Sequence, residues 1–392
     1  MVSAMQSFDM GRVPPVTFGA GRLAELPAVL ESLAEGPVLV IADAILADLG
    51  VTENVAHSLK AAGIASEIAA EISGEPKEAL VDALSARLRA SGAQAVVGIG
   101  GGAAMDAAKL VAAIARSEEP AAAYALGARA LPSNGVPAVA VPTTAGTGSE
   151  VTRTSIVSTD TGAKNWFWGE ELMFAHAILD PELTVSLPSH LTAWTGIDAV
   201  AHALEASTAR KTNAAGQLYG LQALTILAEA LPRVVADGRD IEARGRVLWG
   251  SMLAGLALHN CNTHMGHNIS HALGSVSRIH HGLATGLALE VVLPWLVERE
   301  EGAENYARAA VALGGAPEAH RLPEIFASLL RSCGIDAQLP SVCAAVSAEE
   351  LASAMKSEAN HGISQNAVCA VSEDDLDELA GRMMALPLAN AA

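Results

Sequence analysis

Short apolar runs that alternate with helical patterns in the first half of the chain constrain its fold most. The runs occur at 37–43 (PVLVIAD), 66–72 (SEIAAEI), 93–102 (AQAVVGIGGG) and 137–144 (PAVAVPTT). Such short runs are typical of strands that are buried on both faces of a parallel sheet. Helical patterns such as EALVDALSARLRASG separate them. Strands that alternate with helices predict an α/β domain with a doubly wound parallel sheet.

The second half of the chain has a different pattern. Strand signals nearly vanish after residue 184, and long segments with helical periodicity follow, at 191–209, 216–236 and 244–260. The segment DPELTVSLP at 180–188 has prolines near both ends, which favours a linker. We therefore expect an α/β domain at 1–184 and an all-helical domain at 185–392.

Composition excludes several classes of protein. The formal charge of −19 argues against a nucleic-acid partner and disfavours an anionic membrane surface. We expect no membrane span, because no apolar run is long enough, and no secretory signal, because the N-terminus lacks a basic segment before an apolar one. The four cysteines form no CxxC pair, which fits reduced thiols. A cytoplasmic location is the simplest expectation.

A glycine cluster follows the third apolar run. In VVGIGGGAAMDAAK (96–109), Gly100, Gly101 and Gly102 separate a predicted strand from a predicted helix. Glycines let the backbone approach a ligand closely, and the unpaired N–H groups of the helix N-terminus favour an anion such as a pyrophosphate. Position 103 is Ala, so the pattern is not GxGxxG, and it is not a P-loop. A tight turn without a ligand is the alternative.

A second loop, PTTAGTGSEVT (142–152), follows the fourth run and supplies the hydroxyls of Thr143, Thr144 and Thr147. A connecting loop with local side-chain-to-backbone bonds would have the same composition. Two such loops at the ends of neighbouring strands indicate a nucleotide crevice. Asp43 ends the first run, where a carboxylate binds a ribose 2′-OH and favours NAD over NADP. Capping of the next helix is an equal alternative for Asp43.

Carboxylate and imidazole groups gather in the second half. Asp198 and His202 are four residues apart in GIDAVAHALEA, so a helix places both on one face. Six of the twelve histidines lie in 259–282, where His267 and His271 are again four apart and His281 follows. One carboxylate with several imidazoles suits Zn²⁺ or Fe²⁺, whereas hydrogen-bonded core histidines are the alternative.

Together these motifs resemble the iron-containing (group III) alcohol dehydrogenase family. GGGAAMDAAK, PTTAGTGSEVT, the DPEL segment, GIDAVAHALEA and HNISHALG followed by HHG occur in the family's order. The resemblance implies an N-terminal dinucleotide-binding α/β domain and an all-α C-terminal metal-binding domain, the fold shared with dehydroquinate synthase. It also implies a metal in the cleft between them.

The resemblance carries roles onto residues of this chain. The implied metal ligands are Asp198, His202, His267 and His281, and His271 is the implied catalytic residue, a proton relay beside the metal. The implied cofactor-binding residues, besides Asp43, are Gly100, Gly101, Gly102, Asp106, Thr143, Thr144, Thr147 and Lys164. His259, His264 and His280 are expected to be bystanders. Ala103 replaces the family's usual serine, and the cluster Trp166–Phe167–Trp168 is unusual for it.

The expected activity is reversible hydride transfer between an alcohol and NAD(H), with the metal polarising the oxygen of a small alcohol or aldehyde. We expect Fe²⁺ as the metal, with Zn²⁺ as the alternative, and a homo-oligomer, either a dimer or a larger assembly. Alternatives are a maleylacetate-reductase-like or glycerol-dehydrogenase-like enzyme of the same superfamily, and a non-catalytic protein that binds nucleotide and metal. The complete ligand set argues against the maleylacetate reductases, which lack it.

Overall fold

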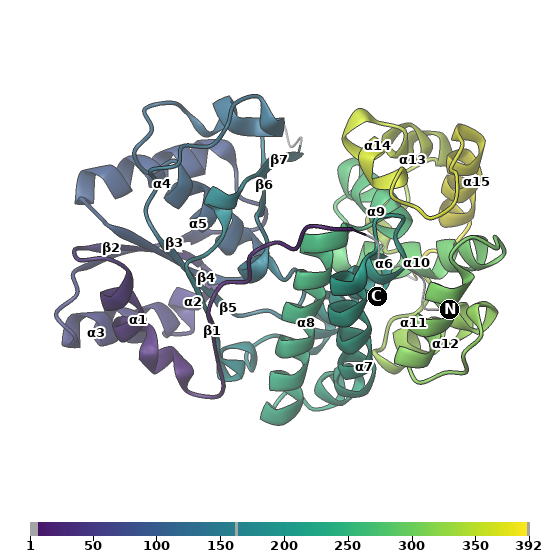
Figure 1. Cartoon of the computed structure of the whole chain (residues 1–392), viewed down its shortest axis with the longest axis horizontal. Helices are drawn as coiled ribbons and strands as arrows, with labels where there is room; N and C mark the ends of the chain where they lie inside the picture. The colour runs from purple at the N-terminus through teal and green to yellow at the C-terminus, as the bar shows by residue number, and fades with distance from the viewer. Residues whose placement is uncertain (1–6, 161–163, 390–392) are drawn as a thin grey trace. The chain divides into compact units, whose positions relative to one another are not determined.

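The computed structural model of the chain describes residues 7–160 and 164–389, which form two compact units (Figure 1). One unit comprises Arg12–Ser186, and the other comprises the chain from Leu187 onward together with the N-terminal residues up to Gly11.

The unit Arg12–Ser186 is built on a parallel sheet of six strands, in the order β1-β8-β5-β4-β2-β3. The strands are β1 (Val16–Phe18), β2 (Val38–Asp43), β3 (Ser66–Ile72), β4 (Ala95–Gly100), β5 (Ala138–Pro142) and β8 (His176–Leu179). The parallel α/β sheet predicted from the alternating runs is confirmed, with β2 to β5 at the four runs. The short strands β1 and β8 complete one side of the sheet.

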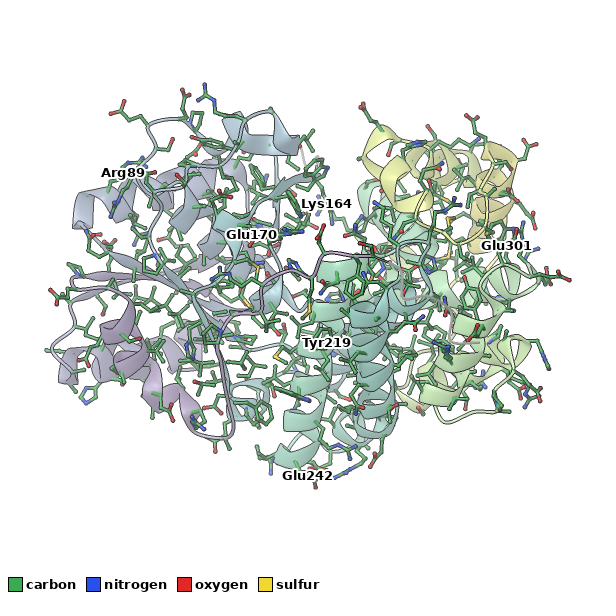
Figure 2. The ribbon with its side chains drawn as sticks, viewed as in Figure 1. Arg89, Lys164, Glu170, Tyr219, Glu242 and Glu301 are labelled. Carbon is green, nitrogen blue, oxygen red and sulfur yellow. The ribbon has the colours of Figure 1, made fainter. Side chains whose placement is uncertain are left out.

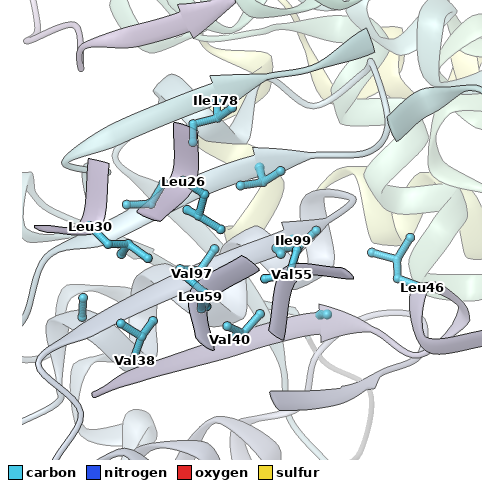
Figure 3. Close-up of a cluster of buried hydrophobic side chains, with 14 residues drawn as sticks. Leu26, Leu30, Val38, Val40, Leu46, Val55, Leu59, Val97, Ile99 and Ile178 are labelled. Atoms are coloured by element: carbon cyan, nitrogen blue, oxygen red, sulfur yellow. The ribbon is translucent and has the colours of Figure 1, made fainter. Parts of the chain in front are cut away.

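Helices cover the sheet because its strands are apolar on both faces. Alternate residues of β2, β4 and β5, such as Val40, Val97 and Val139, form one core with Leu26 and Leu59 of two helices (Figure 3). On the opposite face, a further helix packs on β4, where Gly98 permits close contact with Ala108. The helices are α1 (Leu26–Leu33), α2 (Ile45–Asp48), α3 (Val51–Ala61), α4 (Glu78–Ser91) and α5 (Gly102–Ala113).

A two-stranded antiparallel sheet, β6 (Thr154–Ser158) and β7 (Lys164–Trp168), is inserted in the chain between β5 and β8. The aromatic cluster lies on β7. Phe167 is buried, whereas Trp166 and Trp168 remain 41% and 56% exposed. The alternation of a strand therefore separates the three aromatic side chains, and one of them belongs to a local core.

The second unit is helical, as expected from the periodicity. Its helices are α6 (Ser189–Thr208), α7 (Ala214–Ala236), α8 (Ile241–Cys261), α9 (Met265–Val276), α10 (His281–Val297), α11 (Ala303–Ala312), α12 (Leu322–Ser332), α13 (Ala348–Met355), α14 (Glu358–Ser364) and α15 (Glu373–Met384). Side-chain caps start two of the long helices: Asn213 accepts a hydrogen bond from Gly216 N, and Asp240 accepts one from Ala243 N.

Helix α7 is long and apolar enough, by length and composition, to cross a membrane. It packs along α6 and α8, and a Cβ on Gly196 of α6 would lie 2.2 Å from Leu231 of α7. This close packing buries one face of α7 within the helical unit.

Candidate metal centre and cofactor loops

Helix α6 presents acidic and imidazole side chains to the interior of the helical unit. Asp198, His202 and Glu205 are all buried, at 3%, 6% and 0% exposure. Their spacing of four and three residues places them on one face of the helix. Buried carboxylates without partners are costly, so this face needs compensating groups.

Helices α9 and α10 bring the remaining histidines to the same place. α9 carries His267 and His271, and α10 begins at His281. The start of α10 lies against α6, because a Cβ on Gly282 would meet the carbonyl oxygen of Trp194 at 2.2 Å. Only glycine allows this approach, which places His281 beside Asp198.

Three of the predicted metal ligands converge. Asp198 Oδ1 lies 3.7 Å from His267 Nε2 and 3.5 Å from His281 Nε2. One ligand atom of each of these three residues lies within 4.8 Å of the others. The ring of His202 stacks on that of His267 with centroids 4.7 Å apart, and the ring of His271 lies 5.2 Å from that of His281. The structure thus gathers all five predicted residues of this site.

The donor set fits a divalent cation. Asp198 Oδ1 and His267 Nε2 are buried and have no hydrogen-bond partner within the described chain. Burial lowers the pKa of His267 to about 3, with His202 adding to this effect and Asp198 opposing it. The imidazole is therefore neutral near pH 7, which is the form that binds metals. One carboxylate with imidazoles suits Fe²⁺ or Zn²⁺.

The other three histidines of 259–282 have separate roles. The ring of His259 lies where a Cβ on Gly11 would be, 1.9 Å from Nε2, so it packs against the N-terminal segment. His280 caps α10 by accepting from Gly282 N at 3.2 Å. His264 is completely buried, and its Nε2 lies 3.0 Å from Thr208 Oγ1. His264 also adjoins Glu205, which the sequence reasoning missed, although its spacing from Asp198 and His202 places it on their face of α6.

The glycine loop lies where the order of the sheet reverses. Chain order runs from β2 to β3 on one side and from β4 through β5 to β8 on the other, so the switch point lies between β2 and β4. Asp43 ends β2, and its Oδ2 accepts from Gly101 N at 2.7 Å. Gly100 ends β4 with φ of +150°, and a Cβ there would meet Asp43 Oδ2 at 2.5 Å. Burial raises the pKa of Asp43, and the bond from Gly101 opposes this.

The second predicted loop lies against the first. A Cβ on Gly102 would meet Thr147 Cγ2 at 2.8 Å, and one on Gly101 would meet Thr144 at 3.5 Å. Thr143 N donates to Gly100 O at 2.9 Å. The two loops therefore form one surface around the N-terminus of α5.

The side chain of Asp106 on α5 holds the second loop by hydrogen bonds. Its Oδ1 accepts from Ser149 Oγ at 2.6 Å, and its Oδ2 accepts from Ile156 N at 2.9 Å. Both carboxylate oxygens thus bind protein groups, which ties α5 to the second loop and to β6. This contact shows Asp106 as a residue that holds the loop in place.

The sequence patterns did not indicate two buried ionisable residues at the second loop, Lys109 and Glu150. Lys109 donates to Thr152 Oγ1 at 3.1 Å and to Thr154 O at 2.8 Å. Burial lowers the pKa of Lys109 to about 8, opposed by Asp106 and Glu150, and burial raises the pKa of Glu150 to about 7. Lys109 lies within an Ala-rich helical run, and nothing local in the sequence distinguishes it from a surface lysine.

The cations near β7 have carboxylate partners in their own unit. Lys164 forms an ion pair with Glu75. Arg153 pairs with Glu170 at 2.5 Å and lies over the ring of Trp168 at 4.2 Å. Lys164 and Glu170 are labelled in Figure 2; Lys164 begins β7, and Glu170 lies two residues beyond its end.

Comparison with known proteins matches both units. The family model described as iron-containing alcohol dehydrogenase matches residues 14–181, and the family's C-terminal model matches residues 192–384. The chain is 34% identical over 305 residues to long-chain-alcohol dehydrogenase 1 of Geobacillus thermodenitrificans, covering 77% of this chain and 76% of that protein. It is 32% identical to the NAD-dependent methanol dehydrogenase of Bacillus methanolicus, covering 77% and 79%.

Solved structures agree with these matches. A sulfoacetaldehyde reductase from Bifidobacterium kashiwanohense in complex with NAD⁺ superposes with a TM-score of 0.89 at 25% identity, covering 97% of this chain and 99% of that one. A 1,3-propanediol oxidoreductase superposes with a TM-score of 0.87 at 27% identity, covering 96% and 100%. The chain therefore belongs to the iron-containing alcohol dehydrogenase family and is an NAD(H)-linked, metal-dependent alcohol dehydrogenase.

Proposed function

We propose that this enzyme interconverts a small, uncharged alcohol and its aldehyde or ketone, with the metal held by Asp198, His202, His267 and His281. One observation carries the proposal. Two buried atoms, Asp198 Oδ1 and His267 Nε2, have no hydrogen-bond partner in the described chain and lie 3.7 Å apart. Buried polar atoms without partners mark a site for a missing ligand.

When bound, a divalent metal supplies Lewis acidity towards a substrate oxygen. The chain provides the rest of the site. Asp198 contributes the one negative charge, and neutral imidazoles contribute lone pairs. His271 is half-buried beside His281. In the proposal, its imidazole accepts the hydroxyl proton of the substrate during oxidation and returns it during reduction, the general acid–base role that histidine fills most often.

The cofactor is proposed to bind at the switch point of the parallel sheet. Gly100, Gly101 and Gly102 leave space for the pyrophosphate at the N-terminus of α5. Asp43 is proposed to recognise the ribose, and Thr143, Thr144 and Thr147 to contact the cofactor from the second loop. Asp106 acts by holding that loop, and Lys164 is proposed to approach the nicotinamide ribose. In this proposal 1–184 is the NAD-binding domain and 185–392 is the catalytic metal-binding domain.

The proposed uncharged substrate follows from the cations of the α/β unit. Arg153 and Lys164 are both paired with carboxylates, and Arg278 of the helical unit is exposed. An anionic substrate would have to compete with Glu170 or Glu75 for its partner. The relatives named above act on alcohols such as methanol and long-chain alcohols, which supports a neutral substrate. Sulfoacetaldehyde, the substrate of the structural neighbour, is the matched anionic comparison.

We also propose that the enzyme is a cytoplasmic homo-oligomer. The four cysteines are free and buried in the structure, which fits a reducing compartment. Light scattering of the purified protein measures the assembly, and a mass of one chain would contradict the oligomer.

The experiment that tests the proposal compares neighbouring histidines. His267→Ala and His281→Ala should each lose bound metal and turnover while NADH binding, followed by fluorescence, persists. His280→Asn is the matched control: it changes the adjacent imidazole but keeps a residue that caps helices well, so metal content and turnover should remain. Metal is measured in anaerobically purified protein, and activity with neutral aldehydes and with sulfoacetaldehyde. Turnover that survives in His267→Ala would refute the ligand assignment.

A further inference from the structure

Glu205 is a buried carboxylate whose side chain contacts two histidines, His264 and His267. It lies on α6 at 0% exposure, one turn beyond His202. Its Oε1 accepts from Gly266 N at 2.6 Å, and its Oε2 lies 3.3 Å from His267 N. Both N–H groups belong to the first turn of α9, where helix donors are unpaired and an anion is stabilised.

The carboxylate of Glu205 does more than cap α9, because it also contacts the imidazole ring of His267. Glu205 Oε2 lies 2.5 Å from His267 Nδ1. The two groups are completely or almost completely buried, and 62 residues separate them in the chain. Because a carboxylate only accepts, Nδ1 must carry the hydrogen in this contact.

The position of that hydrogen decides what the other ring nitrogen does. A neutral imidazole has one N–H, so a hydrogen on Nδ1 leaves a lone pair on Nε2. His267 Nε2 is the buried atom without a partner that lies 3.7 Å from Asp198 Oδ1. Glu205 thus selects the tautomer and fixes the ring orientation that a metal at this point requires.

The local sequence is shaped around this contact. A Cβ on Gly266 would lie 3.1 Å from Glu205 Oε1 and 2.7 Å from Leu289, so a larger residue would crowd the carboxylate. On its other side, His264 Nδ1 lies 3.2 Å from Glu205 Oε1, while His264 Nε2 is held by Thr208 Oγ1. Gly266 and His264 therefore hold Glu205 against His267.

We infer that Glu205 is a positioning residue of the metal centre, which acts through His267 and sets the affinity of the site for the divalent ion. The inference rests on the proposed ligand role of His267. It predicts that loss of the carboxylate weakens metal binding about 10- to 100-fold, as for other outer partners of ligating histidines.

The test titrates metal-free protein with Co²⁺ against a chelating competitor and records the visible absorption of bound Co²⁺. Glu205→Gln removes the negative charge, and its single amide oxygen cannot accept from Gly266 N and from His267 Nδ1 at once. We expect affinity lower by about 10- to 100-fold and an altered Co²⁺ spectrum. Glu205→Asp keeps an acceptor on a shorter side chain and should recover part of the affinity. This partial rescue decides the question if the glutamine variant does not fold.

Two control variants separate the possible outcomes. Asn268→Ala removes two buried hydrogen bonds, to Met355 O and Asn360 O, on the next residue of α9. It should lower the melting temperature without changing Co²⁺ affinity. His267→Ala should lose Co²⁺ binding, and if it does not, the proposed ligand set fails. If His267→Ala loses binding while Glu205→Gln and Glu205→Asp bind Co²⁺ as the wild type does, the inference about Glu205 is overturned.

Discussion

The close contact between β4 and α5 makes Gly98→Ala a sharp test of how the cofactor loop is held. A Cβ at Gly98 would lie 2.7 Å from Ala108 Cβ, whereas ordinary contacts begin at 3.4 Å. The next atoms, Ala104 O and Met105 Cα, lie at 3.5 Å, so the overlap involves one methyl group. The helix must therefore move away by several tenths of an ångström, and overpacking of this kind costs about 1–3 kcal/mol.

The single conflicting methyl group gives a matched rescue. Ala108→Gly alone should cost about 2 kcal/mol, from the lower helix propensity of glycine and the lost burial of a methyl group. The double variant places that methyl group on the strand instead of the helix, so only the propensity cost of about 1 kcal/mol should remain. The double variant should therefore be more stable than the sum of the single changes by about 2–4 kcal/mol, which overlaps the upper part of the range for residues in contact.

Native-state hydrogen exchange of the β4 and α5 amides measures the local free energy of opening without assuming that a chain of two units unfolds in one step. NADH binding should weaken in Gly98→Ala and recover in the double variant. If the two changes add within about 0.5 kcal/mol, the contact does not limit the packing of α5 and the reasoning is wrong.

Three further predictions concern the metal, the buried Glu150 and the second loop. Removal of metal with a chelator should lower the melting temperature of the wild type but not that of His267→Ala. An ion at 100 times its dissociation constant stabilises the folded protein by about 2.7 kcal/mol, and His267→Ala should already lack the ion. Equal shifts of the two melting temperatures would contradict the proposed metal site. The pKa of Glu150 is raised to about 7 from 4.5, so the folded protein favours the protonated carboxyl group. Its contribution to the free energy of unfolding is fully present below pH 4.5 and is lost as pH rises through 7. Urea unfolding should show the wild type losing stability relative to Glu150→Gln across that window, and a constant difference would disprove the shift. Gly102→Ala, whose Cβ would meet Thr147 Cγ2 at 2.8 Å, should weaken NADH binding at unchanged metal content, and unchanged NADH affinity would exclude a rigid second loop.

Sequence patterns predicted the parts of the fold that rest on repetition along the chain. Strands β2 to β5 are continuous apolar runs, and α6 to α8 have clear helical periodicity. Strands β1 and β8 have three and four residues, which is too short for any periodicity to be distinctive. Their place in the sheet depends on pairing between residues such as Val16 and Ala177, far apart in the chain.

The site residues that could be predicted were likewise those marked by a pattern along the chain. Asp198 and His202 were predicted because their spacing is local, and the converging histidines because they match a family motif. The roles of Glu205 and Lys109 depend on partners 62 and 43 residues away. No local pattern marks such pairs, because burial and partner are set only when α9 packs against α6, or when the second loop packs against α5.

The contact of Gly282 with Trp194 O has a consequence for variation and engineering of this enzyme. Because a Cβ would lie 2.2 Å from a backbone oxygen, no change of rotamer in a neighbouring side chain can make room for it. The interval between α6 and α10 is therefore fixed at this contact. Gly282 thus determines how closely α10 approaches α6 and so the width of the ion site. A library randomised at position 282 should return only glycine among variants that retain metal.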